Sequence, residues 1–236
     1  MRIGNKFKQE AKIDVLYEDE FVLVVDKPAG LIIDQSEERN SSNTMLFRVN
    51  DYLRARSEKR AYLCHRLDKD TSGCVIFAKT KDIEKKIFDL FKKGEVIKTY
   101  LVVIIGALAR REGTLSFPLK KIGIGREKVI VDKKHGMKAI TQYKLKTIIR
   151  LDKKLPPLSL VKVRLVTGRT HQIRVHFACL RQPVLFDKQY GDQAMNKKFS
   201  SFFPKGKQML NAWKINFIHP VTGDKIKCKS KYEFKI

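Results

Sequence analysis

The sequence predicts a mixed α and β fold that is rich in strands. Short β-branched runs, which are typical of strands, recur along the whole chain. Three segments instead repeat apolar residues at the spacing of an amphipathic helix. Glycines and prolines separate these runs at short intervals, and no internal repeat is present. A length of 236 residues fits one such domain, or one domain with two lobes.

A hairpin and a helix are the first expected elements. Residues 13–17 and 21–26 are β-branched runs on either side of an acidic turn, and a Lys-Pro-Ala-Gly turn follows them. Within residues 43–56, four apolar residues recur at helical spacing, and Ser42 and Asn43 are the candidate capping residues. We expect a helix of about three turns there.

A strand, a helix and a second strand are expected next. Residues 74–78 are apolar on both faces, which is typical of a central strand. Thr80 is the candidate cap of a helix that ends at Gly94. The apolar face of this helix consists of Ile83, Ile87, Phe88 and Phe91. A strand over residues 96–105 follows it.

Strands dominate the second half of the chain. They are expected at residues 128–131, 138–145, 160–165, 210–218 and 225–230. Apolar residues alternate with Lys162 and Arg164 in the third of these runs, as in a strand with one buried face. A short helix is expected after Thr170, and the last two strands form a hairpin. The lysine-rich residues 152–157 predict a surface loop.

The charge balance points to a polyanionic partner. The chain has 50 Lys and Arg against 25 Asp and Glu, a formal net charge of +25, and its isoelectric point is about 10.0. Such an excess destabilises the folded state by self-repulsion unless a polyanion offsets it, so nucleic acid is the expected partner. A hydrophobic content of 43% excludes disorder as the main state.

The cysteines and the hydropathy pattern exclude other classes. Four scattered cysteines contain no Cys-x-x-Cys pair, which argues against a zinc ribbon and a disulfide framework and favours a reducing cytoplasm. The longest apolar stretch, residues 100–109, is half of the roughly 20 residues that cross a bilayer. We therefore expect no membrane span and no signal peptide.

Three polar clusters beside apolar runs are candidates for chemistry, because loops on a rigid scaffold position side chains well. They are residues 65–73 (HRLDKDTSG), 98–100 (KTY) and 167–176 (TGRTHQIRVH). In the first, Asp68 lies among cations and precedes a Thr-Ser-Gly turn. A surface ion pair with Arg66 or Lys69 is the simpler interpretation of Asp68 alone.

The other two clusters also have simple interpretations. Tyr100 follows Lys98 on an expected strand, where core packing is the usual role of a tyrosine. The third cluster places His171 and Arg174 in the first turns of a helix, where N–H groups and a guanidinium can meet phosphate. His171 and His176 are five residues apart and lie on different helical faces, which disfavours a metal site.

Taken together, the clusters have a family resemblance. The run His65-Arg66-Leu67-Asp68-x-x-Thr71-Ser72-Gly73 resembles the signature of the RluA branch of the RNA pseudouridine synthases. Further matches are residues 27–31 (KPAGL) to the first motif of the family, residues 98–100 with Gly106 to its tyrosine strand, residues 167–176 to its arginine motif, and residues 213–223 to its last strand and turn. The matches run in order from about residue 13 to about residue 228.

This resemblance implies an α+β fold, with a long, bent, mostly antiparallel sheet, flanking helices and a central catalytic cleft between two lobes. It also implies isomerisation of specific uridines in structured ribosomal or transfer RNA to pseudouridine, without cofactor or metal. The expected organisation is an N-terminal extension at 1–12 and a catalytic domain at 13–236, with no separate N-terminal RNA-binding domain. We expect a monomer without an obligate protein partner.

The resemblance also implies roles for three catalytic residues. The uracil must leave its glycosidic bond, rotate and reattach through C5, which calls for a nucleophile such as a carboxylate. Asp68 matches the nucleophilic aspartate of the family, and attack at C6 of uracil or at C1′ of ribose both stay open. Tyr100 matches the tyrosine that stacks on uracil and can assist the last proton removal. Arg174 matches the arginine that pairs with the aspartate.

Four further residues are expected to bind RNA. The target uridine must leave the base stack, at a cost of a few kcal/mol. Arg66 resembles the residue that fills the vacated place. Lys98, Arg169 and His171 are the other expected RNA-binding residues, and the remaining cations would follow the phosphate backbone.

The sequence departs from the family pattern at two places. Asp34-Gln35 replace a common His-Pro, and Phe186 replaces the first glycine of a Gly-Asp-x-x-Tyr-Gly element, so we expect altered loops and RNA choice.

Two alternative functions stay open. One alternative is a non-catalytic RNA-binding or ribosome-assembly factor on the same scaffold. The other is a glycosidic hydrolase, which needs a second carboxylate. Asp70 is the only candidate close in sequence.

Overall fold

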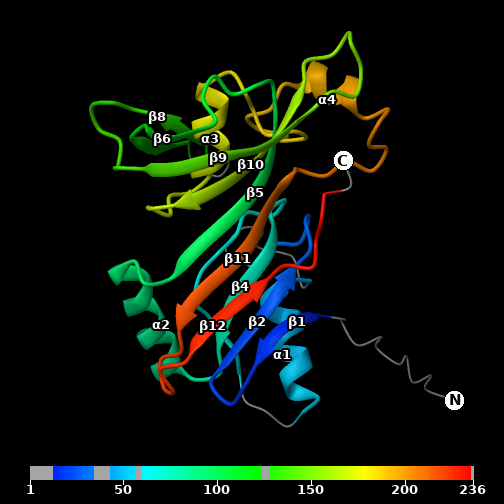
Figure 1. Ribbon diagram of the computed structural model, residues 1–236. Coiled ribbons are helices and arrows are strands. Elements are labelled where there is room, and N and C mark those ends of the chain that lie inside the picture. The colour runs from blue at the N-terminus through cyan, green and yellow to red at the C-terminus, as the bar shows by residue number, and fades with distance from the viewer. Residues whose placement is uncertain (1–12, 35–42, 57–59, 124–127, 235–236) are drawn as a thin grey trace, which may run out of the picture.

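A computed structural model describes residues 13–34, 43–56, 60–123 and 128–234 (Figure 1). The strands are β1 (Asp14–Glu18), β2 (Val22–Lys27), β3 (Tyr62–Leu63), β4 (Ser72–Ala78), β5 (Ile97–Ile105), β6 (Glu112–Ser116), β7 (Leu119–Ile122), β8 (Lys128–Val131), β9 (Ile140–Ile149), β10 (Leu158–Leu165), β11 (Leu210–Ile218) and β12 (Lys225–Lys229). The helices are α1 (Met45–Arg54), α2 (Lys81–Lys93), α3 (Gln172–Cys179) and α4 (Gln193–Phe199).

One long sheet organises the described residues. Its strands lie in the order β1-β2-β4-β11-β5-β10-β9-β6, with β12 paired to β11 and β3 paired to β4. The pairing of β4 with β11 is parallel and the other pairings are antiparallel. β7 and β8 form a separate two-stranded ribbon. The expected α+β fold with a long, mostly antiparallel sheet is confirmed.

Two helices pack on opposite faces of β2 and β4, which explains why every residue of these strands is buried. Leu23 and Val25 share a hydrophobic cluster with Met45 of α1. Their neighbours Val22 and Val24 share another cluster with α2. Successive side chains of a strand point to opposite faces, so a strand covered on both sides reads as a continuous apolar run.

The helix ends show where the expectations hold and where they fail. Thr80 caps α2 through its hydroxyl, and Gly94 ends that helix with φ +74°. At α1 the cap is Thr44, not Asn43, and Ser42 lies outside the described residues. Thr44 is the residue whose hydroxyl accepts from the N–H of Phe47, three positions on, as a cap requires.

Several elements differ from the expectations. Phe88 is 41% exposed, although it shares the spacing of the buried face of α2. The sequence did not predict β3, β6, β7 or α4. These elements are short, and β6, β7 and α4 also contain many polar residues, so tertiary contacts form them and periodicity does not reveal them. Gln35 and the expected extension 1–12 lie outside the described residues. In the part of the chain that the structure describes, no helix is long and apolar enough to cross a membrane.

Candidate catalytic site

The fold brings the three candidate catalytic residues together from distant parts of the sequence. Asp68 lies in the loop between β3 and β4, Tyr100 on β5, and Arg174 in α3. β11 separates β4 from β5 in the sheet. Helix α3 packs Ile173 and Phe177 into the cluster that also contains Tyr100. The side chain of Arg174 therefore reaches the loop of Asp68.

A direct ion pair joins Arg174 to Asp68. Arg174 Nη1 donates to Asp68 Oδ2 at 2.9 Å. The side chain of Arg174 is 9% exposed, whereas that of Asp68 is 26% exposed. The carboxylate is thus held from the protein side and still accessible to a ligand. The partner that the structure gives Asp68 is Arg174, a buried residue that lies 106 positions further along the chain.

Asp187 fixes the other edge of the same guanidinium. Arg174 Nε donates to Asp187 Oδ2 at 2.7 Å and Nη2 donates to Oδ1 at 3.1 Å, a two-pronged contact that aligns a planar guanidinium. Asp187 is fully buried, and the N–H groups of Gln189 and Tyr190 also donate to Oδ1. Burial by itself would raise the pKa of Asp187, but the hydrogen bonds and charge of Arg174 outweigh it and lower that pKa.

Asp187 is the site residue that the sequence reasoning missed. It lies in the Phe-Asp-Lys-Gln-Tyr-Gly segment, which the sequence indicated only as a family element without a role. The available signal was an aspartate beside small and aromatic residues, and an ion pair with a residue 13 positions earlier cannot be read from that.

His171 approaches Asp68 from another side. It precedes α3 with φ +53°, a left-handed conformation that is uncommon outside glycine. Its Nδ1 lies 2.8 Å from the hydroxyl of Tyr190, and its Nε2 lies 3.9 Å from Asp68 Oδ1. The Tyr190 hydroxyl also accepts from the N–H of Val129 in β8. The guanidinium carbon of Arg174 lies 5.0 Å from the centre of the Tyr190 ring.

Tyr100 lies in the wall of the same site. It is 6% exposed, and its hydroxyl forms no hydrogen bond with a described residue. Burial, and then the charge of nearby Asp68, raise the pKa of Tyr100. The hydroxyl is therefore protonated at neutral pH and is no phenolate base.

The loop of Asp68 rests on the Lys-Pro-Ala-Gly turn. Lys27 is 1% exposed, and its ammonium donates to the carbonyl oxygens of Pro28, Leu31 and Lys69 at 2.7 to 3.0 Å. The N–H of Gly30 also donates to Lys69 O. Two donors from this turn therefore hold the residue that follows Asp68, which gives the turn a positioning role.

The four expected RNA-binding residues lie in the loop of Asp68, on β5 and in the arginine motif. His171 contacts the Asp68 pair, as described above. A Cβ on Gly168 would lie 3.0 Å from Lys98 Nζ, so this lysine borders the arginine motif, and burial lowers the pKa of Lys98. Arg66 and Arg169 are exposed, and Arg169 Nε donates to Lys138 O at 3.3 Å.

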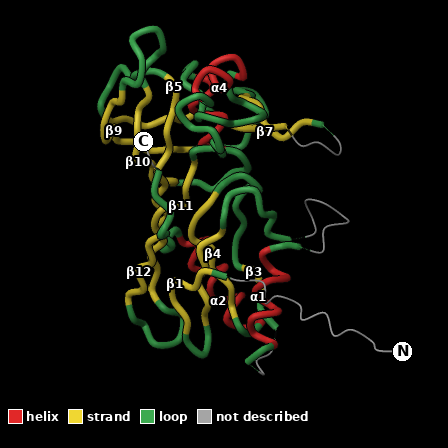
Figure 2. The backbone as a smooth tube through the Cα atoms, turned by 90° about the vertical axis from the view of Figure 1, so that its right-hand side faces the viewer, coloured by secondary structure: helices red, strands yellow, loops and turns green. Residues whose placement is uncertain are grey.

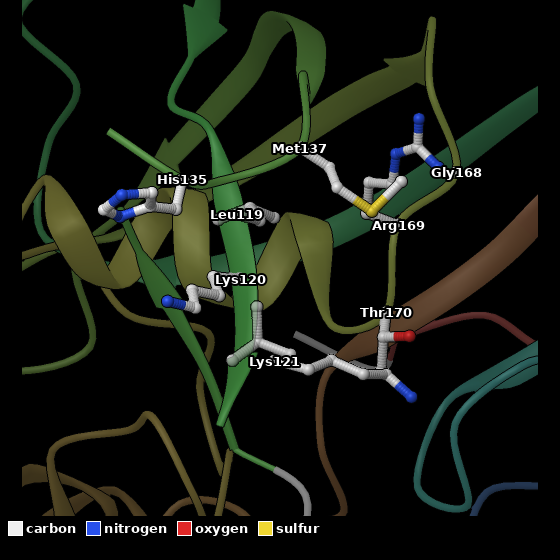
Figure 3. A pocket seen from close by; sticks show the side chains of 9 residues that line it. Leu119, Lys120, Lys121, His135, Met137, Gly168, Arg169 and Thr170 are labelled. Atoms are coloured by element: carbon white, nitrogen blue, oxygen red, sulfur yellow. The ribbon is translucent and has the colours of Figure 1, made fainter. Parts of the chain in front are cut away.

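A pocket of about 320 Å³ lies beside the start of α3 (Figure 3). Its lining consists of Leu119, Lys120, Lys121, Val129, His135, Met137, Gly168, Arg169 and Thr170. The β7–β8 ribbon and the arginine motif thus share a wall with apolar and basic side chains. Val129 connects this wall to the Asp68 site through Tyr190.

The arrangement of Asp68 and Arg174 suits a nucleophilic carboxylate better than a pair of carboxyl groups that act as general acid and general base. Among the described residues, no group of three or more His, Cys, Asp and Glu could hold a metal ion. A glycosidic hydrolase needs a second carboxyl group with a raised pKa. Asp187 is the carboxylate on the far side of Arg174, and its pKa is lowered.

Comparisons with known proteins agree on one family. The family model of RNA pseudouridylate synthase matches residues 21–179. An uncharacterised RNA pseudouridine synthase of Aquifex aeolicus is 33% identical over 217 residues, which cover 90% of this chain and 67% of that protein. Ribosomal large subunit pseudouridine synthase D of Xanthomonas campestris is 34% identical, over 94% of this chain and 66% of that protein.

Other relatives differ in substrate and in length. The tRNA pseudouridine synthase C of Vibrio parahaemolyticus is 28% identical, over 94% of this chain and 91% of that protein. The chain spans about two thirds of the first two relatives and most of this one. The solved structure of human RNA pseudouridylate synthase domain containing 1 has a TM-score of 0.74 at 23% identity, over 98% of this chain and 86% of that chain, and shows the same fold.

Proposed function

The chain belongs to the RNA pseudouridylate synthase family, and on that premise we propose that it isomerises specific uridines of structured ribosomal or transfer RNA to pseudouridine with Asp68 as nucleophile. The single observation that carries the assignment is the 2.9 Å contact between Arg174 and the partly exposed carboxylate of Asp68. Relatives that modify ribosomal and transfer RNA support RNA as the partner.

The reaction exchanges one bond of the ribose for another. The Asp68 carboxylate attacks C6 of uracil or C1′ of ribose, and the N1–C1′ bond breaks. The uracil rotates, C5 bonds to C1′, and the aspartate leaves. C5 loses its proton and N1, which no longer carries the ribose, gains one, so no atom is gained or lost overall. No external co-reactant is needed, because the carboxylate that attacks is regenerated.

Arg174 contributes by aiming the nucleophile. Its Nε and Nη2 are occupied by buried Asp187, so Nη1 has one fixed direction toward Asp68. Small errors in the position of a reacting group can cost about a hundredfold in rate. Asp187 is therefore a positioning residue for the proposed reaction.

Tyr100 offers an aromatic face and a protonated hydroxyl next to Asp68. Stacking of uracil on the ring would hold the base during its rotation. Because the pKa of Tyr100 is raised, its hydroxyl would pass the C5 proton onward to a neighbouring base and would not take it as a phenolate. Asp68 is the nearest candidate for that base.

Four basic residues around the site would bind the extruded nucleotide and its neighbours. Arg66 would occupy the place of the flipped uridine, and Lys98, Arg169 and His171 would contact RNA around it. We further propose that residues 13–236 act as one catalytic domain and that the protein works as a monomer in the cytoplasm.

The rival function is an RNA-binding factor without catalysis. A carboxylate that faces an anionic ligand weakens binding, so a pure binder gains nothing from Asp68. The fully buried Asp187 that holds Arg174 toward Asp68 also has no purpose in a binder. Both observations favour an enzyme.

Replacement of Asp68 by asparagine tests the proposal. Asp68→Asn keeps the shape of the side chain but removes the nucleophile, so release of tritium from RNA labelled at uracil C5 should stop while RNA binding persists. Asp70→Asn, two residues further along the same loop, is the matched control and should keep the activity. Near wild-type release by Asp68→Asn would refute the nucleophile. Mapping of pseudouridines in total RNA, with and without the gene, identifies the RNA.

A further inference from the structure

The sheet has a face that the proposed reaction does not use. Tyr100 points toward α3, so its neighbours Thr99 and Leu101 on β5 point to the opposite side. Figure 2 shows β12, β11, β5, β10 and β9 as one wall of strands. Helix α4 covers one end of its outer side, where Phe199 clusters with Val103 and Leu158. Away from that end, the outer side of β9, β10, β11 and β12 carries mostly exposed side chains that a partner can reach.

Cross-strand pairing gathers cations on that side. Lys214 is paired with Lys229 and with Thr99, and Thr99 is paired in turn with Arg164. One row below, Lys162 is paired with Lys144. We define the outer basic face by the side chains of Lys144, Lys162, Arg164, Lys214, Lys227 and Lys229. Apart from half-buried Lys214, all of them are exposed.

Very little negative charge balances this face. Lys144 pairs with Glu112 at 3.1 Å, and Lys229 lies 4.0 Å from Glu233. Lys162, Arg164 and Lys214 form no ion pair with a described residue. Like charges directly opposite each other destabilise a sheet, and Lys214 with Lys229 and Lys162 with Lys144 are two such pairs. A bound polyanion would relieve this repulsion.

An aromatic residue lies among these cations. Trp213 occupies an irregularity of β11, where the register with β5 shifts between Asn211 and Lys214. The ammonium groups of Lys214 and Lys229 lie 4.2 and 5.8 Å from the centre of its ring. Trp213 is half-buried and belongs to none of the hydrophobic clusters of the described residues. Cations around an accessible aromatic ring are typical of surfaces that bind nucleic acid without sequence preference.

We propose that the outer basic face binds the phosphate backbone of RNA, as a second contact surface on the side of the sheet opposite Asp68. This rests on the proposed function only for the choice of RNA as the polyanion. The surface recognises charge and not sequence, so it would hold a segment of a folded RNA away from the target uridine. It would add affinity without taking part in the chemistry.

The fluorescence of Trp213 is an intrinsic probe of this surface. Trp213 is the only tryptophan of the sequence, so tryptophan fluorescence reports on the outer basic face alone. The test titrates an unmodified transfer RNA transcript into the full protein and records fluorescence quenching and electrophoretic mobility together. The proposal expects saturable quenching with the same dissociation constant that the mobility shift gives.

A charge-neutral variant tests which cations are responsible. The triple variant Lys162→Gln, Arg164→Gln, Lys214→Gln should bind the transcript roughly tenfold more weakly, and the slope of log affinity against log salt should fall by roughly 2 to 3. The matched control removes three exposed lysines of α2 by Lys85→Gln, Lys86→Gln, Lys93→Gln. It should keep the quenching and most of the affinity. Single-turnover rates on saturating RNA should be equal in both variants.

Other results would overturn the proposal. Saturating RNA without quenching, or equal losses of affinity in the two triple variants, would show that RNA does not occupy this face. Quenching by vesicles of anionic lipid, in the absence of quenching by RNA, would assign the face to a membrane instead. These readouts need no turnover. A failure of uridine isomerisation in the Asp68 experiment would therefore leave them interpretable.

Discussion

Asp187 determines where Arg174 can point. Both carboxylate oxygens accept from the guanidinium, and asparagine would turn one of them into an NH2 group that opposes an N–H of Arg174. Asp187→Asn should therefore lower the single-turnover rate about a hundredfold, because the nucleophile loses its aim. RNA affinity should change only a few-fold. Rapid-quench kinetics and filter binding measure the two quantities.

The control for this variant is Asp89→Asn on the exposed side of α2, which should leave both quantities unchanged. A purely structural role would lower the melting temperature of Asp187→Asn but leave the rate per folded molecule intact. That outcome, measured at a temperature where the variant is folded, contradicts the positioning role.

Phe186 shows how this chain accommodates a departure from its family. It has φ +60°, where a glycine costs nothing and another residue is strained by about 1 to 2 kcal/mol. Its ring occupies the space beside Gly206, since a Cβ on Gly206 would lie 2.3 Å from the ring. The ring also packs edge-on against Phe203. Packing of the Phe186 ring against Gly206 and Phe203 therefore offsets the backbone strain at Phe186.

This packing predicts coupling between the two positions. Gly206→Ala should destabilise the protein by about 1 to 3 kcal/mol, because the new methyl group collides with the Phe186 ring. In the background of Phe186→Gly the same alanine meets no ring and should cost much less. Urea unfolding of the two single variants and the double variant measures the difference. Additive effects in this cycle would show that the ring is not the obstacle.

The residue scale also shows what sequence can reveal about a site. Asp68, Tyr100 and Arg174 each stand in a short motif with a characteristic spacing, so the sequence indicated them before the fold was known. Asp187 acts only through Arg174, from a segment with no chemical signature of its own. Positioning residues of this kind become visible only when the contacts are known.

At the scale of the elements, the start of α3 gives the two arginines of the arginine motif different environments. The helix begins at Gln172, so Arg169 lies before it and is exposed, whereas Arg174 lies in its first turns and is buried. A lysine offers a mobile point charge in place of a planar fork. Arg174→Lys should therefore lower turnover strongly with a small change in RNA affinity. Arg169→Lys should mainly weaken affinity, mildly and in a salt-dependent manner.

Single-turnover kinetics and binding at two salt concentrations separate these effects. Each variant is the control for the other, because both replace an arginine of the same motif by the same residue. Loss of chemistry in Arg169→Lys, with turnover intact in Arg174→Lys, would mean that Arg169 and not Arg174 serves the nucleophile.

Sequence patterns predict long apolar elements and fail for short polar ones. β2, β4 and β5 are dense in β-branched residues, and their positions were predicted within a few residues. β7 contains two lysines in four residues and pairs with β8 and with Met137, so its strand form depends on these neighbours. The exposure of Phe88 has a similar cause, since helical spacing does not tell how wide the buried face of α2 is.

At the scale of the whole molecule, the sequence does not reveal which distant segments contact each other. β4 lies parallel to β11, and Asn211 of β11 donates to Ser72 of β4. The end of the described chain returns to its beginning, where Ser230 donates to both oxygens of Asp26. No local pattern marks these pairings, because they depend on the order of strands in the completed sheet.

The stability of the molecule should decrease in mild acid. Burial, and then the charge of Lys98, lower the pKa of His65 to about 3. Its Nε2 accepts from the N–H of Ile76 in β4, so the folded state holds the neutral ring. In the unfolded chain the histidine has a pKa of roughly 6.5 and binds a proton below it. The unfolded state therefore gains protons first, and the free energy of unfolding falls as pH drops from about 6.5 toward 3.

Urea unfolding at pH 7, 6 and 5 measures this effect above the ordinary pKa values of Asp and Glu. The contribution of His65 is roughly 1 to 2 kcal/mol between pH 7 and pH 5. Burial also lowers the pKa of His176, which adds in the same direction. In His65→Gln the titrating group is absent, so the loss between pH 7 and pH 5 should shrink by that amount, whatever the variant costs at pH 7. An equal loss in the wild type and the variant would show that His65 is protonated in the folded state as readily as in the unfolded chain.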